Sequence, residues 1–418
     1  MLQAFYTGIS SIQNIQVGID VVADNLANTS TIGFKGQSVE FSSLLSAEKT
    51  VLARNSIVDA VSGQGAQIQA TPIDMSGGSL ILSDRNTDLA IDGDGWFGVN
   101  AGAGTFYTRD GGFTFDGERD LVSYDGYHLL GTIANNIEGE SLTKEISSLA
   151  LGEVATQEPL NFPVSLKYPA VATTQTSFSG NLGTANETRS MSAKIVDSAG
   201  EKNNLRLVFN QTTPQPAFGT SWDVVATVQN IEGTEIFDTK NGVVTFDDAG
   251  GLLNSTLPSV NNNGSEVSIN LGTGYSGLIS SSGLDITASS SADGLESGDL
   301  IGYGINANAE VIASFNNGRQ SVVGKIAIFH FQNDQGLTKV GNSRFSESPN
   351  SGDPIFFKDA QGQNILGANV QNFKLESSNV KFEVGLTELI VMQRAYDANS
   401  KSITTADQML QKALSMDA

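Results

Sequence analysis

Residues 2–27, LQAFYTGISSIQNIQVGIDVVADNLA, carry apolar side chains at alternating spacings of three and four residues. This spacing places the apolar side chains along one side of an α-helix, so the stretch predicts a helix about 39 Å long at ~1.5 Å per residue. The helix is expected to end near Asn28, where polar side chains compete for backbone hydrogen bonds before Gly33. The predicted seam of this helix consists of Leu2, Phe5, Ile9, Ile12, Ile19, Ala23 and Leu26.

A second helix of the same design is predicted near the other end of the chain, from Phe382 to Ala413, behind N-cap candidates at 377–379. Its seam consists of Leu389, Met392, Tyr396, Asn399, Ile403, Ala406 and Leu410. Each helix could pack on its own domain, as most amphipathic helices do. Because the residues between them read as strands and turns, we expect the two helices to pair as a coiled coil and to offer their remaining apolar surface to other copies.

The segments between the helices are rich in hairpin signals, including Asp110-Gly111, Asp125-Gly126 and the glycines at 250–251. The expected fold is therefore an α+β multidomain protein, with a terminal helical pair and nested, mainly-β domains. The predicted division is a helical core domain (1–27 and 377–418), an extended connector (28–71 and 361–376), an inner β-domain (72–168 and 299–360) and an outer β-domain (169–298).

Composition excludes several classes of function. Only 16% of residues are charged and the formal net charge is −22, which disfavours a nucleic-acid surface. The chain has no cysteine, so disulfides, thiolate metal sites and thiol catalysis are excluded. No basic residue precedes Lys35 and no long apolar run occurs, so we expect neither a cleavable signal peptide nor a membrane span, and any export must use an uncleaved route.

Candidate metal and catalytic sites are weak. Asp92 and Asp94 flank glycines, but a calcium loop starting at Asp92 would place Ala103 at its twelfth, carboxylate position. A tight turn before buried Trp96 is the better interpretation. His128 and His330, the only histidines, lie in strand-like segments. We therefore predict no catalytic residue, no metal site and no cofactor.

Both ends of the chain resemble bacterial flagellar rod and hook proteins. The N-terminal GISSIQNIQVGIDVVADNLANTSTIGFKG is similar to the family segment in which NLANxxTxGFK closes the first helix, and NTDLAIDGDGWF and FYTRDGGFTFDGERDLVSYDGYHLLG are similar to later family segments. The C-terminal SNVKFEVGLTELIVMQRAYDANSKSITTADQML resembles the closing helix. The resemblance marks Asn25, Leu26, Asn28, Gly33, Phe34 and Lys35 as the connector motif.

The middle of the chain, with SWDVVATV and GVVTFDDAGGLL, resembles the outer domain of the hook members of this family. The resemblance implies a structural hook subunit that is exported by the flagellar type III route and self-assembles into a flexible tube transmitting motor torque. The implied partners are copies of itself and the rod, hook-cap, hook–filament junction and export-apparatus proteins. The alternatives are a distal rod protein and, in a different class, a secreted β-rich binding or carbohydrate-active protein.

Overall fold

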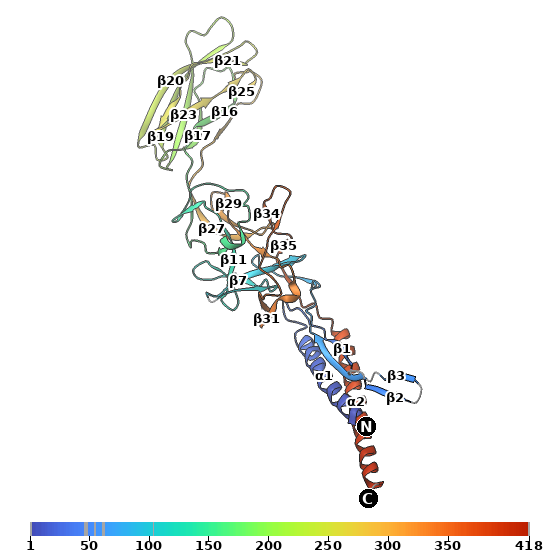
Figure 1. Cartoon of the computed structure of the whole chain (residues 1–418). Helices are drawn as coiled ribbons and strands as arrows, with labels where there is room; N and C mark the ends of the chain where they lie inside the picture. The colour runs from blue at the N-terminus through green and yellow to red at the C-terminus, as the bar shows by residue number, and fades with distance from the viewer. Residues whose placement is uncertain (1, 46–48, 54–55, 61–62, 103, 417–418) are drawn as a thin grey trace.

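The computed structural model describes residues 2–45, 49–53, 56–60, 63–102 and 104–416. The molecule is elongated, with a helical stalk at one end, an inner β-body in the middle and an outer β-sandwich at the far end (Figure 1). Apart from two single-turn 3₁₀ segments, η1 (Val154–Thr156) and η2 (Asp334–Gly336), the described elements are strands and two terminal helices. The predicted mainly-β fold with a helix at each end is confirmed.

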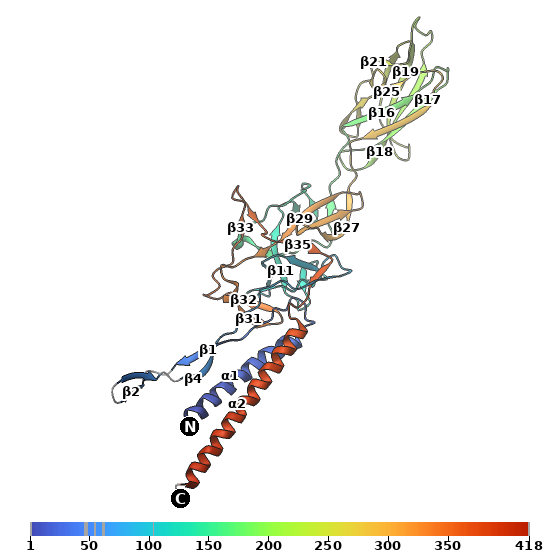
Figure 2. The same ribbon diagram turned by 90° about the vertical axis from the view of Figure 1, so that its right-hand side faces the viewer.

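The stalk consists of α1 (Leu2–Ala27) and α2 (Phe382–Met416), which lie side by side. Helix α2, at 35 residues, continues beyond the N-terminal end of the 26-residue α1 (Figure 2). Helix α1 has no basic residue in its last turn, and the first turn of α2 has a single acidic residue, Glu383. Charges that interact favourably with the helix dipoles are therefore few, and the stability of the two helices must come mainly from packing. The coiled-coil geometry itself stays a prediction.

Strands accompany α1 on a second side. The segment predicted as a connector contains β1 (Glu40–Leu45), β2 (Lys49–Ala53), β3 (Ser56–Ala60) and β4 (Gly63–Ala70). Strand β1 pairs with β4 in antiparallel fashion, and β2 pairs with β3. The Ser10 hydroxyl donates to the Ala66 carbonyl over 3.2 Å, and the Asn14 amide donates to the same oxygen over 2.5 Å. Helix α1 therefore lies between α2 and the β1–β4 hairpin.

The inner β-body is built on one 15-stranded sheet. Strand β11 pairs with β7 from the outgoing chain and with β29 from the returning chain, so the residues before and after the outer sandwich share this sheet. Its strands are β7 (Trp96–Asn100), β8 (Thr105–Thr108), β9 (Phe113–Phe115), β10 (Leu121–Ser123), β11 (His128–Ile133), β12 (Ile137–Glu138), β13 (Ser141–Leu142), β14 (Glu158–Pro159), β15 (Lys167–Tyr168), β27 (Gly298–Ile305), β28 (Glu310–Phe315), β29 (Gln320–Ile326), β30 (Ile328–Phe329), β31 (Thr338–Gly341) and β32 (Arg344–Ser346).

Three two-stranded pairs complete the inner body, and two of them join it to the start of α2. They are β5 (Leu80–Leu82) with β36 (Lys374–Glu376), β6 (Leu89–Asp92) with β35 (Asn369–Asn372), and β33 (Phe357–Lys358) with β34 (Asn364–Ile365). The core holds fully buried aromatic rings such as Phe97 and Phe113, whose centroids are 5.2 Å apart in an edge-on arrangement.

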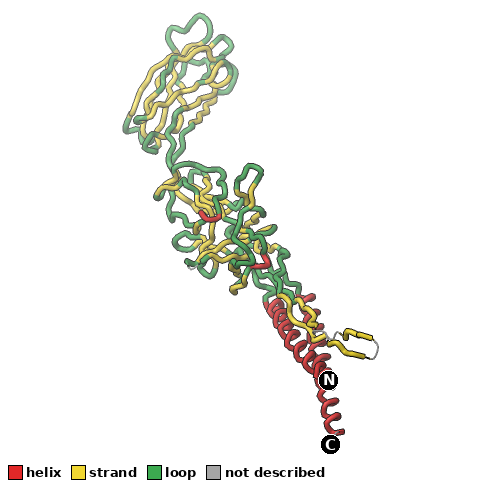
Figure 3. Tube along the Cα trace, in the orientation of Figure 1, coloured by secondary structure: helices red, strands yellow, loops and turns green. Residues whose placement is uncertain are grey.

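The outer sandwich packs a five-stranded sheet against a six-stranded sheet (Figure 3). In β17 and β18 the apolar residues alternate with polar ones, so one face of the sheet is buried. The five-stranded sheet contains β17 (Arg189–Val196), β18 (Lys202–Gln211), β19 (Thr220–Asn230), β20 (Ile236–Phe246) and β21 (Leu252–Ser255). The six-stranded sheet contains β16 (Gln175–Asn181), β22 (Val260–Asn262), β23 (Ser265–Asn270), β24 (Gly272–Thr273), β25 (Ser276–Ile279) and β26 (Thr287–Ala292).

The predicted hairpin at Asp110-Gly111 is wrong. Strands β8 and β9 do not pair with each other: β8 pairs with β7 and β32, and β9 pairs with β10. Gly111 instead approaches β6 so closely that an added Cβ would lie 1.7 Å from the Leu89 carbonyl oxygen. The chain therefore turns away at Gly111 to a different neighbour. The hairpins at Asp125-Gly126 and at 250–251 are confirmed by the β10–β11 and β20–β21 pairs.

Candidate assembly surface

The two terminal helices approach each other through glycine. A Cβ added to Gly8 would lie 2.7 Å from Cγ1 of Ile403, and one added to Gly18 would lie 2.9 Å from the sulfur of Met392. Both distances are shorter than normal contacts, so a side chain at either position requires the facing Ile403 or Met392 side chain to move. Glycine at these positions thus sets the separation of the two helices over two or more turns of the stalk.

A third close contact lies where the stalk meets the inner body. A Cβ on Gly385, in the first turn of α2, would lie 2.2 Å from Cδ1 of Leu26 at the end of α1. Val22, one turn earlier on α1, is 2% exposed and Asn25 is 9% exposed. The face of α1 that contacts α2 therefore includes Gly8 and Gly18 as well as the predicted seam residue Leu26.

The predicted seam positions are mostly half-buried in the isolated chain. On α1, Phe5, Ile9, Ile12, Ile19 and Leu26 are half-buried and Ala23 is exposed, while the Leu2 side chain lies outside the described part of the structure. On α2, Ala406 is buried, Tyr396 is just exposed, and Leu389, Met392, Asn399, Ile403 and Leu410 are half-buried. Their role in assembly stays a prediction.

Helix α2 carries apolar side chains that no described part of the chain covers. They are Phe382, Val384, Leu386, Ile390, Val391, Met409 and Leu414, with exposed fractions from 37% to 72%. Gly385 and Ala406 are buried, and most of these exposed residues lie on other sides of α2, whereas Leu414 follows Leu410 by four residues and so lies on the same side as the predicted seam. Large exposed apolar surfaces on a soluble chain are typical of sites that another protein covers.

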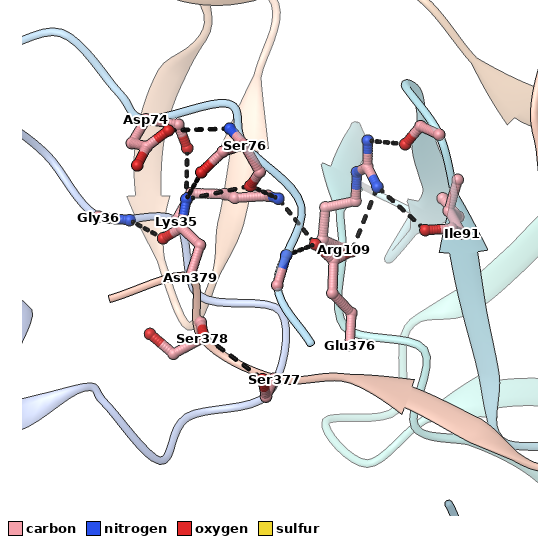
Figure 4. A network of polar contacts seen from close by, with 12 residues as sticks. Lys35, Gly36, Asp74, Ser76, Ile91, Arg109, Glu376, Ser377, Ser378 and Asn379 are labelled. Carbon is pink, nitrogen blue, oxygen red and sulfur yellow. Dashed lines mark hydrogen bonds and ion pairs between the residues drawn. The ribbon is translucent and has the colours of Figure 1, made fainter. Parts of the chain in front are cut away.

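A buried ionic cluster joins the stalk to the inner body (Figure 4). The Glu376 carboxylate accepts a hydrogen bond from the Lys35 ammonium at 2.7 Å and one from the Arg109 guanidinium at 3.2 Å. The side chains of all three residues are at most 5% exposed. We call Lys35, Arg109 and Glu376 the junction cluster. It brings together residues 341 and 267 positions apart in the sequence.

Backbone groups satisfy the rest of the junction cluster. The Lys35 ammonium also donates to the Ser76 carbonyl at 2.7 Å, and the Arg109 guanidinium donates to the Gly93 carbonyl at 2.8 Å. Burial lowers the pKa of the Lys35 ammonium from its ordinary value, and the neighbouring Glu376 carboxylate opposes part of this shift. Because two cations share one carboxylate in a dry site, loss of Glu376 would leave both poorly compensated.

Side-chain amides extend the junction into both helices. Asn25 of α1 both donates to the Gln37 carbonyl at 2.6 Å and accepts from the Gln37 amide at 3.0 Å. Asn379, just before α2, accepts from the Gly36 amide at 2.9 Å and donates to the Asp74 carbonyl at 2.8 Å (Figure 4). The connector is thus tied to the end of α1 through Asn25 and to the residues just before α2 through Asn379.

Gly33 is required by the same junction. It adopts a left-handed φ of 65°, and an added Cβ would lie 2.3 Å from the Asp110 amide nitrogen. Its own amide donates to the Glu376 carbonyl at 2.8 Å. Of the other connector residues, Phe34 and Lys35 are buried, and Asn28 accepts a hydrogen bond from the Thr31 hydroxyl.

The two histidines and the turn at Asp92 make contacts within the fold of the inner body. The buried His330 ring lies with Nε2 2.7 Å from the Leu366 carbonyl, and burial lowers its pKa. His128 Nδ1 lies 3.3 Å from an Asp120 oxygen on the same sheet. Trp96 and Phe97 after the Asp92 turn are buried, as predicted. Within the described residues, no three His, Asp or Glu side chains gather at a point suited to a metal ion.

Sequence reasoning missed Arg109 and Glu376, and it considered Asn379 only as an N-cap candidate. One available signal was that Lys35 is the first basic residue of the chain and lies between apolar residues and glycines, where a cation requires a partner.

Neither helix among the described residues is both long enough and apolar enough to cross a membrane.

Comparison with known proteins agrees with this architecture. The model "Flagellar hook protein FlgE/F/G D1 domain" matches residues 90–155, which lie in the inner body, and the model "Flagellar basal body rod FlgEFG protein C-terminal" matches residues 371–416, which include α2. The chain is 29% identical to the flagellar hook protein FlgE of Borreliella burgdorferi, over 99% of both chains. The chain is therefore similar to flagellar rod and hook proteins over nearly its whole length.

Further relatives cover the chain equally well. It is 27% identical to the flagellar hook protein FlgE of Treponema pallidum over 100% of both chains, and 25% identical to that of Salmonella typhimurium over 97% of this chain and 98% of that protein. A crystal structure of the flagellar hook protein FlgE2 of Helicobacter pylori superposes with a TM-score of 0.48 at 17% identity, covering 71% of this chain and 100% of that one.

Proposed function

We propose that this axial protein is the structural subunit of the flagellar hook and that it self-assembles into a flexible helical tube. The observation that carries the proposal is the set of exposed apolar side chains along α2, from Phe382 to Leu414, beside a paired α1. Fully burying one Leu, Ile or Phe contributes about 1.5–3 kcal/mol, so several such side chains per subunit suffice to hold a polymer. Relatives named as hook proteins that align over nearly the whole chain support the hook over other axial positions.

The proposed division of labour follows the long axis of the molecule. Residues 1–27 and 377–418 form the tube core through the two predicted seams, residues 28–71 and 361–376 connect this core to the body, and the inner domain (72–168 and 299–360) and outer domain (169–298) form the outer layers. Before assembly both termini are expected to be disordered, because an isolated seam does not offset the entropy of ordering it.

Torque must pass between the stalk and the β-bodies in this proposal. The junction cluster supports such a role, because the Glu376 carboxylate, just before the start of α2, accepts buried charge-assisted hydrogen bonds from Lys35 of the connector and Arg109 of the inner body. The contacts between copies would slide in the outer layers while the stalk keeps its packing. A heterologous contact that does not close on itself generates such a helical tube.

The proposed location is the hook outside the cell, reached through the flagellar export apparatus without cleavage of a signal peptide. The proposed partners are further copies of the chain, the rod, the hook cap and the hook–filament junction proteins. No enzymatic activity, cofactor or metal is proposed.

Electron microscopy of basal bodies from cells lacking this protein tests the assignment. A complete rod with no hook is the expected result. A truncated rod would instead assign the protein to the distal rod, the nearest alternative. Intact hooks and filaments, together with a saturable ligand or substrate for the purified β-bodies, would favour a secreted binding or carbohydrate-active protein and contradict the proposal.

A further inference from the structure

The outer sandwich contains a slot between two strand edges. Strand β17 pairs only with β18, and β26 pairs only with β16, so within the described residues each strand has one edge without a ladder partner. The two edges meet where the Ser290 hydroxyl donates to the Ser192 carbonyl at 2.7 Å. Next to this contact lies a groove of about 540 Å³, lined by residues 192–194 of β17, residues 290–292 of β26, and Ile231.

The slot is lined mainly by small polar side chains, including Asn203 and Asn204 of β18, and it offers one exposed apolar side chain, Ile231, and one free positive charge, Lys194. Ile231 is 58% exposed, and Ala193 and Ala292 also line the groove. Lys194 is exposed and has no carboxylate within 4.0 Å among the described side chains. Basic groups are scarce in this chain, which has 23 Lys and Arg against 45 Asp and Glu. Unpaired strand edges are templates for an added segment, and a charged residue restricts which segment can add.

The complementary surface lies at the opposite end of the same domain. Because β17 runs back toward the inner body and β18 runs away from it, the loop of residues 212–219 lies at the far tip of the sandwich, as Figure 1 shows. Phe218 in this loop is 81% exposed. The exposed carboxylate of Asp248 accepts a hydrogen bond from the Gly219 amide, so it lies beside Phe218. The tip is therefore an exposed aromatic ring with a negative charge.

We infer that the tip loop of one copy docks in the β17–β26 slot of the next copy, with Phe218 against Ile231 and Asp248 facing Lys194. The inference rests on the proposed polymer and adds the contact by which the outer domains stack. Charge complementarity identifies a second copy as the occupant, since apolar surface and one unpaired charge of opposite sign are present on each side. Tip and slot lie at opposite ends of one domain, so the contact is heterologous and extends along a polymer without closing.

Seeded polymerisation of the full-length chain tests the contact through the critical concentration measured by sedimentation. We expect Phe218→Ser to raise this concentration about tenfold, whereas Tyr275→Ser, which removes an aromatic ring 66% exposed at the same end, should leave it unchanged. Asp248→Lys and Lys194→Glu should each raise it severalfold. Because every copy carries both surfaces, the double variant D248K/K194E should return it to within about twofold of wild type.

A covalent readout is available because the chain contains no cysteine. Mild oxidation of polymer built from the double variant F218C/S192C, with Ser192 exposed in the slot, should give a ladder of multimers, since each copy links to a different neighbour at each surface. Each single variant should remain monomeric. Wild-type protein that forms no polymer would overturn both the proposed function and the contact. Polymer with an unchanged critical concentration for Phe218→Ser and with no ladder would overturn the contact alone.

Discussion

Replacing Glu376 by glutamine should destabilise the inner body far more than the loss of a surface ion pair. The Glu376 carboxylate accepts hydrogen bonds from the Lys35 ammonium, the Arg109 guanidinium and the Gly78 amide, and its side chain is 1% exposed. A neutral amide keeps the shape but leaves two buried cations without a counter-charge. Breaking a buried ion pair by removing one partner costs about 3–5 kcal/mol, and we expect that magnitude for E376Q.

The matched control is Glu296→Gln. Glu296 pairs with Lys202 at 2.6 Å, but both side chains are nearly half exposed. Water solvates either charge once its partner is lost, so this variant should cost about 0–1 kcal/mol. The two variants remove the same charge by the same chemical change, so the difference between them reports the burial of Glu376 and its larger number of partners.

Urea unfolding followed by tryptophan fluorescence measures both variants. The chain has two tryptophans, Trp96 in the inner body and Trp222 in the outer sandwich, so a Trp222→Phe background leaves Trp96 to report on E376Q, and a Trp96→Phe background leaves Trp222 to report on E296Q. The Trp96 ring centre lies 5.6 Å from the Arg109 guanidinium carbon, close to the junction cluster. A loss for E376Q no larger than that for E296Q would refute the reasoning. So would an E376Q cost that is unchanged in a Lys35→Met background, where one of the stranded cations is already absent.

Three further predictions concern the stalk, the junction backbone and pH. Gly18→Val should reduce polymer yield in sedimentation assays because its Cβ would collide with Met392, and a second substitution Met392→Ala should restore much of it. Gly33→Ala should cost roughly 3 kcal/mol or more of inner-body stability in urea unfolding, against about 1–2 kcal/mol for Gly126→Ala, which has a similar left-handed φ but open space at the Cβ. Glu310 is desolvated, which raises its pKa, but hydrogen bonds from Asn306, the Leu149 amide and Ser148 and the charge of Lys325 lower it more, so the folded state binds the proton less readily than the unfolded state. The stability that wild type holds over Glu310→Gln should therefore be greatest above pH 4.5 and disappear as pH falls through the lowered pKa, and a difference in stability that stays constant down to pH 2 would contradict this.

Local pattern predicted much of the secondary structure. The spacing from Leu389 to Leu410 selects the side of α2 that is least exposed in the structure, because the helical repeat depends only on neighbouring residues. The Asp125-Gly126 turn likewise joins two paired strands. The hairpin predicted at Asp110-Gly111 is wrong because Gly111 instead allows the chain to pass close to β6. An Asp-Gly dipeptide can form a hairpin turn or permit such a close approach, and local sequence does not distinguish the two roles.

Local sequence accounts for the helices at both ends, for the alternation in β17 and β18 that buries one face of the five-stranded sheet, and for the family resemblance of both ends. Each of these depends on residues a few positions apart or on short motifs. Folding brings Lys35 and Arg109 to Glu376, joins β11 to strands from both sides of the outer domain, and packs α1 against α2 at Gly8 and Gly18. These contacts span hundreds of residues, and a glycine chosen for close approach leaves no hydrophobic periodicity, so the folded chain alone reveals them.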